Sequence, residues 1–96
     1  MTNLISNLNR VLESRIRLGI MSVLYVNDSA DFGTMKDLME LTDGNLASHI
    51  KALEGAGYVT SSKQFIGRKP NTSYSITRPG RQAFREHIDA LEKLLK

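Results

Sequence analysis

Cysteine and tryptophan are both absent from this chain of 96 residues, and proline occurs only twice. Without cysteine the chain can form no disulfide, thiolate zinc site or thiol-based redox switch. No apolar stretch approaches the roughly 20 residues that a membrane-spanning helix needs. The first seven residues lack the basic and apolar regions of a signal peptide. We therefore expect a cytoplasmic protein without a membrane partner, folded as one small domain over residues 1–96.

Acidic residues are missing from one long stretch. Residues 60–85 carry six Lys or Arg and no Asp or Glu, whereas the other 70 residues hold seven basic and ten acidic side chains. The formal net charge of +3 is too small to indicate a partner by itself. Basic charge gathered on one surface does attract phosphate. The distribution of charge therefore favours a nucleic-acid partner.

The residue patterns of catalysis are also missing. His49 and His87 lie far apart in the sequence, and neither is near a Ser or Cys nucleophile pattern. There is no phosphate loop, zinc motif or pair of catalytic carboxylates. Asp28 and Asp31 share a loop, but two carboxylates without an ordered series of ligands are typical of a solvated loop. We predict no catalytic residue, no metal site and no cofactor, and we expect that the chain is not an enzyme.

Apolar periodicity predicts a mainly α fold with a small β component. Leu4, Ile5, Leu8, Val11 and Leu12 recur at helical spacing and predict a short amphipathic helix. The predicted elements that follow are a helix over 14–26, a single ladder contact near 30–33, helices over 34–40 and 43–54, strands over 59–65 and 72–76, and a helix over 78–95.

Polar residues mark the expected ends of these elements. Thr34 and Asp37 have the spacing of a capping box, after which Met35, Leu38 and Met39 should face inward. Thr42 or Asp43 should cap the next helix, and Thr77 the last one. Gly67, Pro70 and Asn71 predict the turn of a hairpin, with its tip over 66–71.

The stretch LTDGNLASHIKALEGAGYV, residues 41–59, resembles the recognition-helix segment of bacterial winged-helix regulators. Residues 67–70, GRKP, and 72–81, TSYSITRPGR, resemble the wing and the entry to the last helix. The chain is similar to small winged helix-turn-helix regulators related to the MarR and ArsR groups. The resemblance implies a three-helix core with a β-hairpin wing and terminal dimerisation helices. The helix-turn-helix would span 34–56, the wing 59–76 and the last helix 78–95.

The resemblance also implies a homodimer that binds operator DNA, usually as a repressor. ArsR-type metal sensors carry Cys or His clusters, which this chain lacks. Classical MarR proteins are longer and form an effector pocket, for which this chain has little room. A small-molecule effector therefore stays an open question.

The recognition helix and the wing are the expected sources of DNA contacts. An α-helix fits the major groove and its exposed side chains reach base edges, whereas a narrow minor groove attracts basic side chains. The helix-turn-helix residues expected at the DNA are Thr34, Lys36, Asn45, Ser48, His49 and Lys51. Those of the wing are Arg68, Lys69 and Thr72.

Other interpretations of these residues remain open. The helix residues also fit a solvated face, and His49 fits a partly buried structural histidine. The basic hairpin also fits protection of an edge strand. Arg81 and Arg85 have a less certain role, because they also fit a balance of charge with Glu86 and Glu13.

Apolar residues near both ends predict a dimer interface. They exceed what a small core easily covers, and a twofold dimer would place two recognition helices about one duplex turn apart on a palindromic site. These residues are Leu4, Ile5, Leu8, Ile88, Leu91 and Leu95. Packing of the two terminal segments within one chain is the alternative. A winged helix used for protein interaction, without DNA binding, is the competing function, although such a module would not need a basic wing.

Overall fold

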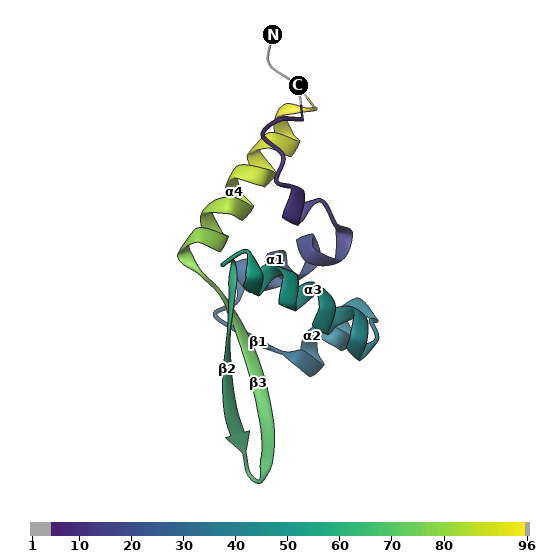
Figure 1. Ribbon diagram of the computed structural model, residues 1–96, viewed down its shortest axis with the longest axis vertical. Helices are drawn as coiled ribbons and strands as arrows, with labels where there is room; N and C mark the ends of the chain where they lie inside the picture. Colours follow the sequence, from purple (N-terminus) through teal and green to yellow (C-terminus); the bar gives the residue numbers. More distant parts are fainter. Residues whose placement is uncertain (1–4, 96) are drawn as a thin grey trace.

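The computed structural model describes residues 5–95 and has the element order of a winged helix. Helices and strands follow one another as predicted from the helix at 14–26 onward, and the hairpin projects from one end of the molecule (Figure 1). The elements are η1 (Arg10–Leu12), α1 (Arg15–Val26), β1 (Ala30–Asp31), α2 (Phe32–Met39), α3 (Asp43–Gly55), β2 (Val59–Ile66), β3 (Lys69–Ile76) and α4 (Arg78–Lys93).

The three strands form an antiparallel sheet in the order β1-β3-β2. Strand β1 contributes two residue pairs, Ala30 with Tyr74 and Asp31 with Ser73, at the base of the sheet. The pairing of β2 with β3 continues eight pairs long, from Val59 opposite Ile76 to the pair beside the turn. The outer part of the hairpin is therefore a two-stranded ribbon that extends beyond the helices (Figure 1).

The wing turn is tighter than the sequence predicted. Only Gly67 and Arg68 separate the strands, and Lys69 and Pro70 already belong to β3. Gly67 has a φ of +66°, a left-handed conformation that glycine adopts without a steric penalty. Glycine at the first of two central positions is typical of the turn that matches the twist of a hairpin. The predicted tip over 66–71 was therefore too wide.

The core lies where α1, α2 and α3 meet the base of the sheet and α4. As predicted, Leu46, Ile50 and Leu53 form the buried stripe of α3. Burying a large aliphatic side chain stabilises the fold by about 1.5–3 kcal/mol. The other buried core residues are Leu12, Ile20, Met21, Leu24, Met35, Val59 and Phe84.

The helix caps agree with the sequence prediction at α3 and α4 but not at α2. The side chains of Thr42 and Thr77 accept hydrogen bonds from the first turns of α3 and α4. Helix α2 starts earlier than expected, because Asp31 and not Thr34 caps it. Met35 is fully buried, whereas Leu38 is 64% exposed, so the prediction that Leu38 faces inward was wrong.

The predicted N-terminal helix is wrong for the described residues. Residues 5–8 form turns, followed by the single 3-10 turn η1, and Leu4 lies outside the described residues. Asn9 explains the difference, because its side chain accepts the Val11 N–H at 2.9 Å and caps η1. The Asn9 N–H donates to His87 Nδ1 at 2.9 Å, and its amide donates to the Tyr58 hydroxyl at 2.9 Å. One asparagine thus joins the N-terminal segment to α4 and to the wing base.

The base of the wing is fixed by contacts between two chain segments. The Thr77 N–H donates to the Tyr58 carbonyl at 2.9 Å, and the Thr77 hydroxyl donates to the Gly57 carbonyl at 2.6 Å. A Cβ atom on Gly80 would overlap the Tyr58 carbonyl, so only glycine allows this approach. The end of α3, the wing and the start of α4 therefore keep a fixed relative position.

Helix α4 ends at Lys93, two residues before the predicted end. Phe84 and Ala90 are buried and Ile88 and Leu91 are half-buried, whereas Leu95 beyond the helix is 87% exposed. Across residues 5–95, no helix has the length and apolar character to cross a bilayer.

Candidate nucleic-acid interface

Helix α3 presents polar side chains on the side opposite its buried stripe. Ser48 and Lys51 are exposed on this face, as the spacing predicted, and Asn45, which flanks the face, is exposed as well. An α-helix with this surface can enter a major groove and bring amide, hydroxyl and ammonium groups to bases and phosphates. These three residues therefore form the helix part of the candidate interface.

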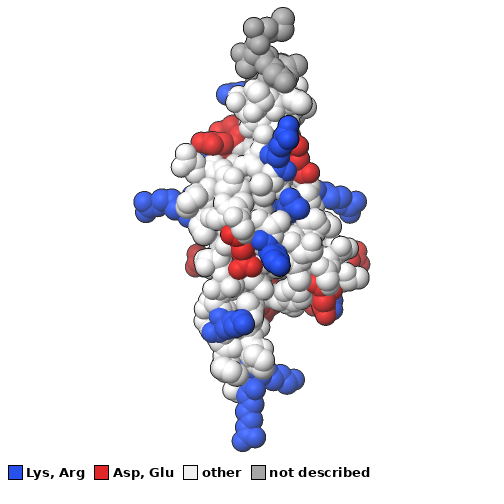
Figure 2. All heavy atoms as spheres, in the orientation of Figure 1, with Lys and Arg blue, Asp and Glu red and all other residues white. Residues whose placement is uncertain are grey.

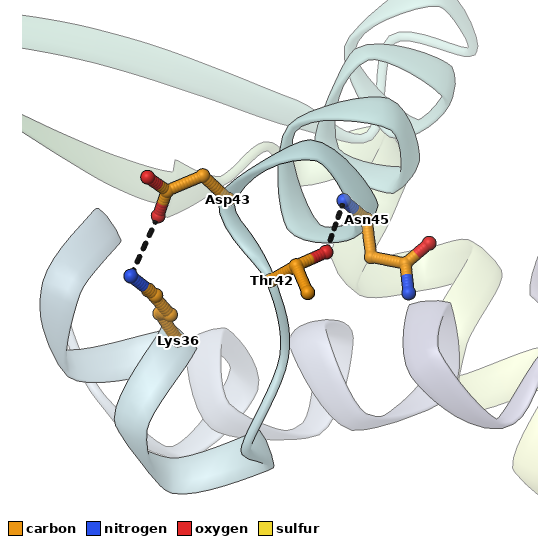
Figure 3. Close-up of polar contacts among 4 residues, drawn as sticks. All are labelled: Lys36, Thr42, Asp43 and Asn45. Atoms are coloured by element: carbon orange, nitrogen blue, oxygen red, sulfur yellow. Dashed lines mark hydrogen bonds and ion pairs between the residues drawn. The ribbon is translucent and has the colours of Figure 1, made fainter.

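The start of α3 is held by a hydrogen bond that leaves Asn45 available. Thr42 Oγ1 accepts the Asn45 N–H at 3.1 Å. The side-chain amide of Asn45 points away from this cap (Figure 3). The backbone of Asn45 therefore fixes the helix, while its side chain stays free for an adenine edge.

Lys36 is held by an acidic residue of the recognition helix. Its Nζ lies 2.9 Å from Asp43 Oδ1, and both side chains are substantially exposed (Figure 3). The hydrogen bond to Asp43, and then the charge of Asp43, raise the pKa of Lys36. Asp43 stabilises the N-terminus of α3 through the helix dipole. In this arrangement Lys36, predicted to touch the DNA backbone, is paired with a carboxylate.

Thr34 lies near the wing, but its N–H is already used. This N–H donates to Asp31 Oδ1 at 2.7 Å, because Asp31 caps α2. Hydrogen bonding from the side chain and backbone of Thr34 holds the pKa of Asp31 below its ordinary value. Thr34 lines a polar hollow between α2 and the wing together with Gln64 and Asn71. Both donors of Thr34 are therefore engaged by Asp31, which makes its expected contact with the DNA backbone less favourable.

His49 connects α3 to α1. Arg17 Nε donates to His49 Nδ1 at 3.1 Å, and Arg17 Nη1 donates to the Val11 carbonyl at 3.3 Å. Arginine has only donors, so His49 Nδ1 must be the acceptor. Since the imidazole is half-buried in this contact, the geometry favours the structural interpretation of His49 over the DNA contact.

The wing carries the exposed basic charge of the site. Lys63, Arg68 and Lys69 are exposed, and Figure 2 shows basic side chains at the end of the hairpin without an acidic neighbour there. Thr72 is half-buried and pairs across the ribbon with Lys63. The wing therefore offers a positive end at some distance from α3.

Arg81 and Arg85 are not part of this basic surface. Arg81 Nη1 donates to the Tyr25 carbonyl at 3.2 Å, and its guanidinium carbon lies 4.9 Å from the centre of the Tyr25 ring. The Arg85 guanidinium carbon lies 5.8 Å from the same ring, and its Nη2 donates to the Tyr25 hydroxyl. Both arginines join α4 to α1 through Tyr25. The acid-free stretch 60–85 thus divides into a wing and a helix-packing segment.

Sequence reasoning missed two features of the surface. The pair Lys36–Asp43 joins two helices across their turn, and no local pattern shows it. Phe65 and Ile66 are 76% and 65% exposed at the wing end, where the sequence predicted only basic and polar contacts. Their position directly before Gly67 is the signal that was available, because residues beside a tight turn are distant from the core.

Comparison with known proteins agrees with this arrangement. The sequence model of the winged helix DNA-binding domain family matches residues 16–95, so the chain belongs to that family. An uncharacterized protein of Methanocaldococcus jannaschii is 36% identical over 87 residues, which are 91% of this chain and 95% of the relative.

Solved structures show the same fold. A transcriptional regulator homologue from Pyrococcus horikoshii superposes with a TM-score of 0.85 at 32% identity, over 96% of this chain and 89% of that one. The transcriptional regulator Tm0710 from Thermotoga maritima gives 0.71 at 21% identity, over 85% and 57%, which supports the fold alone. The predicted class, a winged helix-turn-helix transcriptional regulator, is therefore confirmed. Members of this class are generally not enzymes.

Proposed function

We propose that two copies of this chain bind a palindromic DNA operator and repress transcription from it. The observation that carries the proposal is the combination of a polar, exposed face on α3 with a basic wing end that extends beyond the helices and has no acidic neighbour there. Helix α3 enters the major groove, while the wing lies at the adjacent minor groove. Bound in this way, the dimer covers the operator and excludes other proteins from it.

The two parts of the surface have different tasks. Asn45 and Ser48 offer amide and hydroxyl groups that read base edges. The other contacts position the protein on phosphates and carry little sequence information. We assign them to Lys51, Arg68, Lys69 and Thr72.

The apolar surface at the opposite end supports the homodimer. The N-terminal segment runs beside α4, to which Asn9 is bonded through His87. Ile5, Leu94 and Leu95 are 59%, 40% and 87% exposed in this region. Leu8, Ile88 and Leu91, which were also predicted at the interface, are half-buried. A second copy that packs here buries these side chains and places two α3 helices on one face of the duplex.

Salt-dependent binding to a random-sequence duplex, followed by fluorescence anisotropy, tests the proposal. Each neutralised phosphate makes the logarithm of affinity fall with the logarithm of salt by a slope of about 0.9. Replacing Arg68 and Lys69 by Ala should weaken binding to all sequences and reduce the slope by about 1.8. Lys93→Ala, at the opposite end of the molecule, is the control. Absence of binding at low salt would reject the proposal, and sedimentation analysis independently tests the dimer.

A further inference from the structure

Two large apolar side chains are exposed at the end of the wing. Phe65 is 76% and Ile66 is 65% exposed, although residues of this kind are usually withdrawn from water. In β2 only Val59 is buried, and all residues after it are exposed. Toward the turn, the last residue of β3 that still pairs with β1 is Ser73, which lies opposite Ser62 of β2. The ribbon extends about 13 Å beyond it, four residues at about 3.3 Å each, so the core cannot cover its end.

The apolar residues lie on both faces of this ribbon. Successive side chains of a strand point to opposite faces, so Phe65 and Ile66 diverge. Phe65 is paired with Pro70, and Ile66 with Lys69, on the opposite strand. A flat partner surface can cover only one of these faces. A groove with two walls can contact both.

The charges at the wing end favour one kind of groove. Arg68 lies in the turn and Lys69 directly follows it, and residues 59–76 contain no acidic side chain. A basic tip flanked by apolar side chains complements a groove with phosphate edges and apolar sugar walls. Proteins that enter the minor groove insert Phe, Ile or Pro there beside basic residues. All three residue types occur at this wing end.

We propose that Phe65 and Ile66 are DNA contacts, which enter the minor groove and pack against its sugars and base edges. This inference rests on the proposed function. It adds apolar contacts with DNA to the phosphate contacts that we propose for the basic wing residues. A ribbon with side chains on both faces is about 10 Å thick, wider than a minor groove of about 6 Å. The contact therefore widens the groove and bends the duplex away from the wing.

Phe65→Thr and Ile66→Thr, singly and together, test this contact. Threonine retains a preference for strands while it removes most of the apolar surface. Val26→Thr is the matched control, because Val26 is 78% exposed at the end of α1 and away from the wing end. Thermal melting checks that each variant keeps its fold.

Anisotropy with a random-sequence duplex, measured from 50 to 300 mM salt, gives the main result. We expect the double variant to bind about tenfold more weakly, as for partial burial of two large side chains, with an unchanged salt slope because no phosphate contact is lost. Energy transfer between dyes at the duplex ends should show a smaller bend. Val26→Thr should behave like the parent protein.

Other results would overturn the inference in distinguishable ways. If the parent protein binds and the double variant binds equally well, Phe65 and Ile66 are not DNA contacts, although the proposed function stands. If the parent protein binds no duplex, both proposals fail. If the substitutions change only sedimentation, or only binding to anionic lipid vesicles, the wing end serves a second copy or a membrane surface instead.

Discussion

Asp43→Asn should make the protein bind DNA more tightly and not less. Asp43 holds Lys36 at 2.9 Å and places a negative charge at the start of the recognition helix. The substitution keeps the side-chain size but removes this charge, so Lys36 becomes available to a phosphate. Since the two side chains are 40% and 74% exposed, their ion pair adds little to folding stability.

The size of this effect follows from counterion release. One additional phosphate contact steepens the salt slope by about 0.9. Affinity should then fall by an additional factor of about 3.5 between 50 and 200 mM salt. Anisotropy with a random-sequence duplex measures both slope and affinity. Asp89→Asn, on the exposed side of α4, controls for net charge alone. Equal slopes for Asp43→Asn and Asp89→Asn would refute the reasoning, as would weaker binding by Asp43→Asn.

Three further predictions concern stability. Gly80→Ala should destabilise the protein by about 1–3 kcal/mol, because its Cβ would overlap the Tyr58 carbonyl; denaturant unfolding measures this. Thr42→Ala should cost about 1 kcal/mol by the same assay, through loss of the α3 cap, whereas Thr42→Ser should retain it. His87 is 3% exposed, and its pKa is lowered by burial, partly opposed by Glu13. The unfolded chain therefore binds a proton first, so the free energy of unfolding should fall as pH decreases from about 6.5 to below the folded pKa. His87→Gln should lack this dependence.

Much of the fold could be predicted from local signals. The stripe Leu46, Ile50 and Leu53 and the cap residues Thr42 and Thr77 act within one or two helical turns. Gly67 fixed the position of the wing because its left-handed φ favours glycine. In each case the information lies within a few residues.

Contacts between distant residues caused the errors. Asp31 caps α2 beside its pairing with Ser73 in β3, which shifts the start of the helix away from Thr34. The N-terminal segment is held by Asn9, whose partners Tyr58 and His87 lie 49 and 78 residues away. A local periodicity cannot show such partners.

The candidate site was predicted unevenly for the same reason. The exposure of Asn45, Ser48 and Lys51 follows directly from helix periodicity. The engagement of Lys36 by Asp43 and of His49 by Arg17 depends on how two helices meet. Their expected DNA contacts therefore stay predictions that the structure makes less favourable.

Selection of preferred duplexes from a random pool shows whether α3 reads sequence as part of a dimer. We expect enrichment of a palindrome whose half-sites are about one duplex turn apart. We also expect Asn45→Ala to change the preferred base at one position in each half-site, and Arg68→Ala to lower affinity while leaving the preferred α3 half-site unchanged. A pool that shows no enriched sequence, or a single half-site without symmetry, would contradict sequence reading by a dimer.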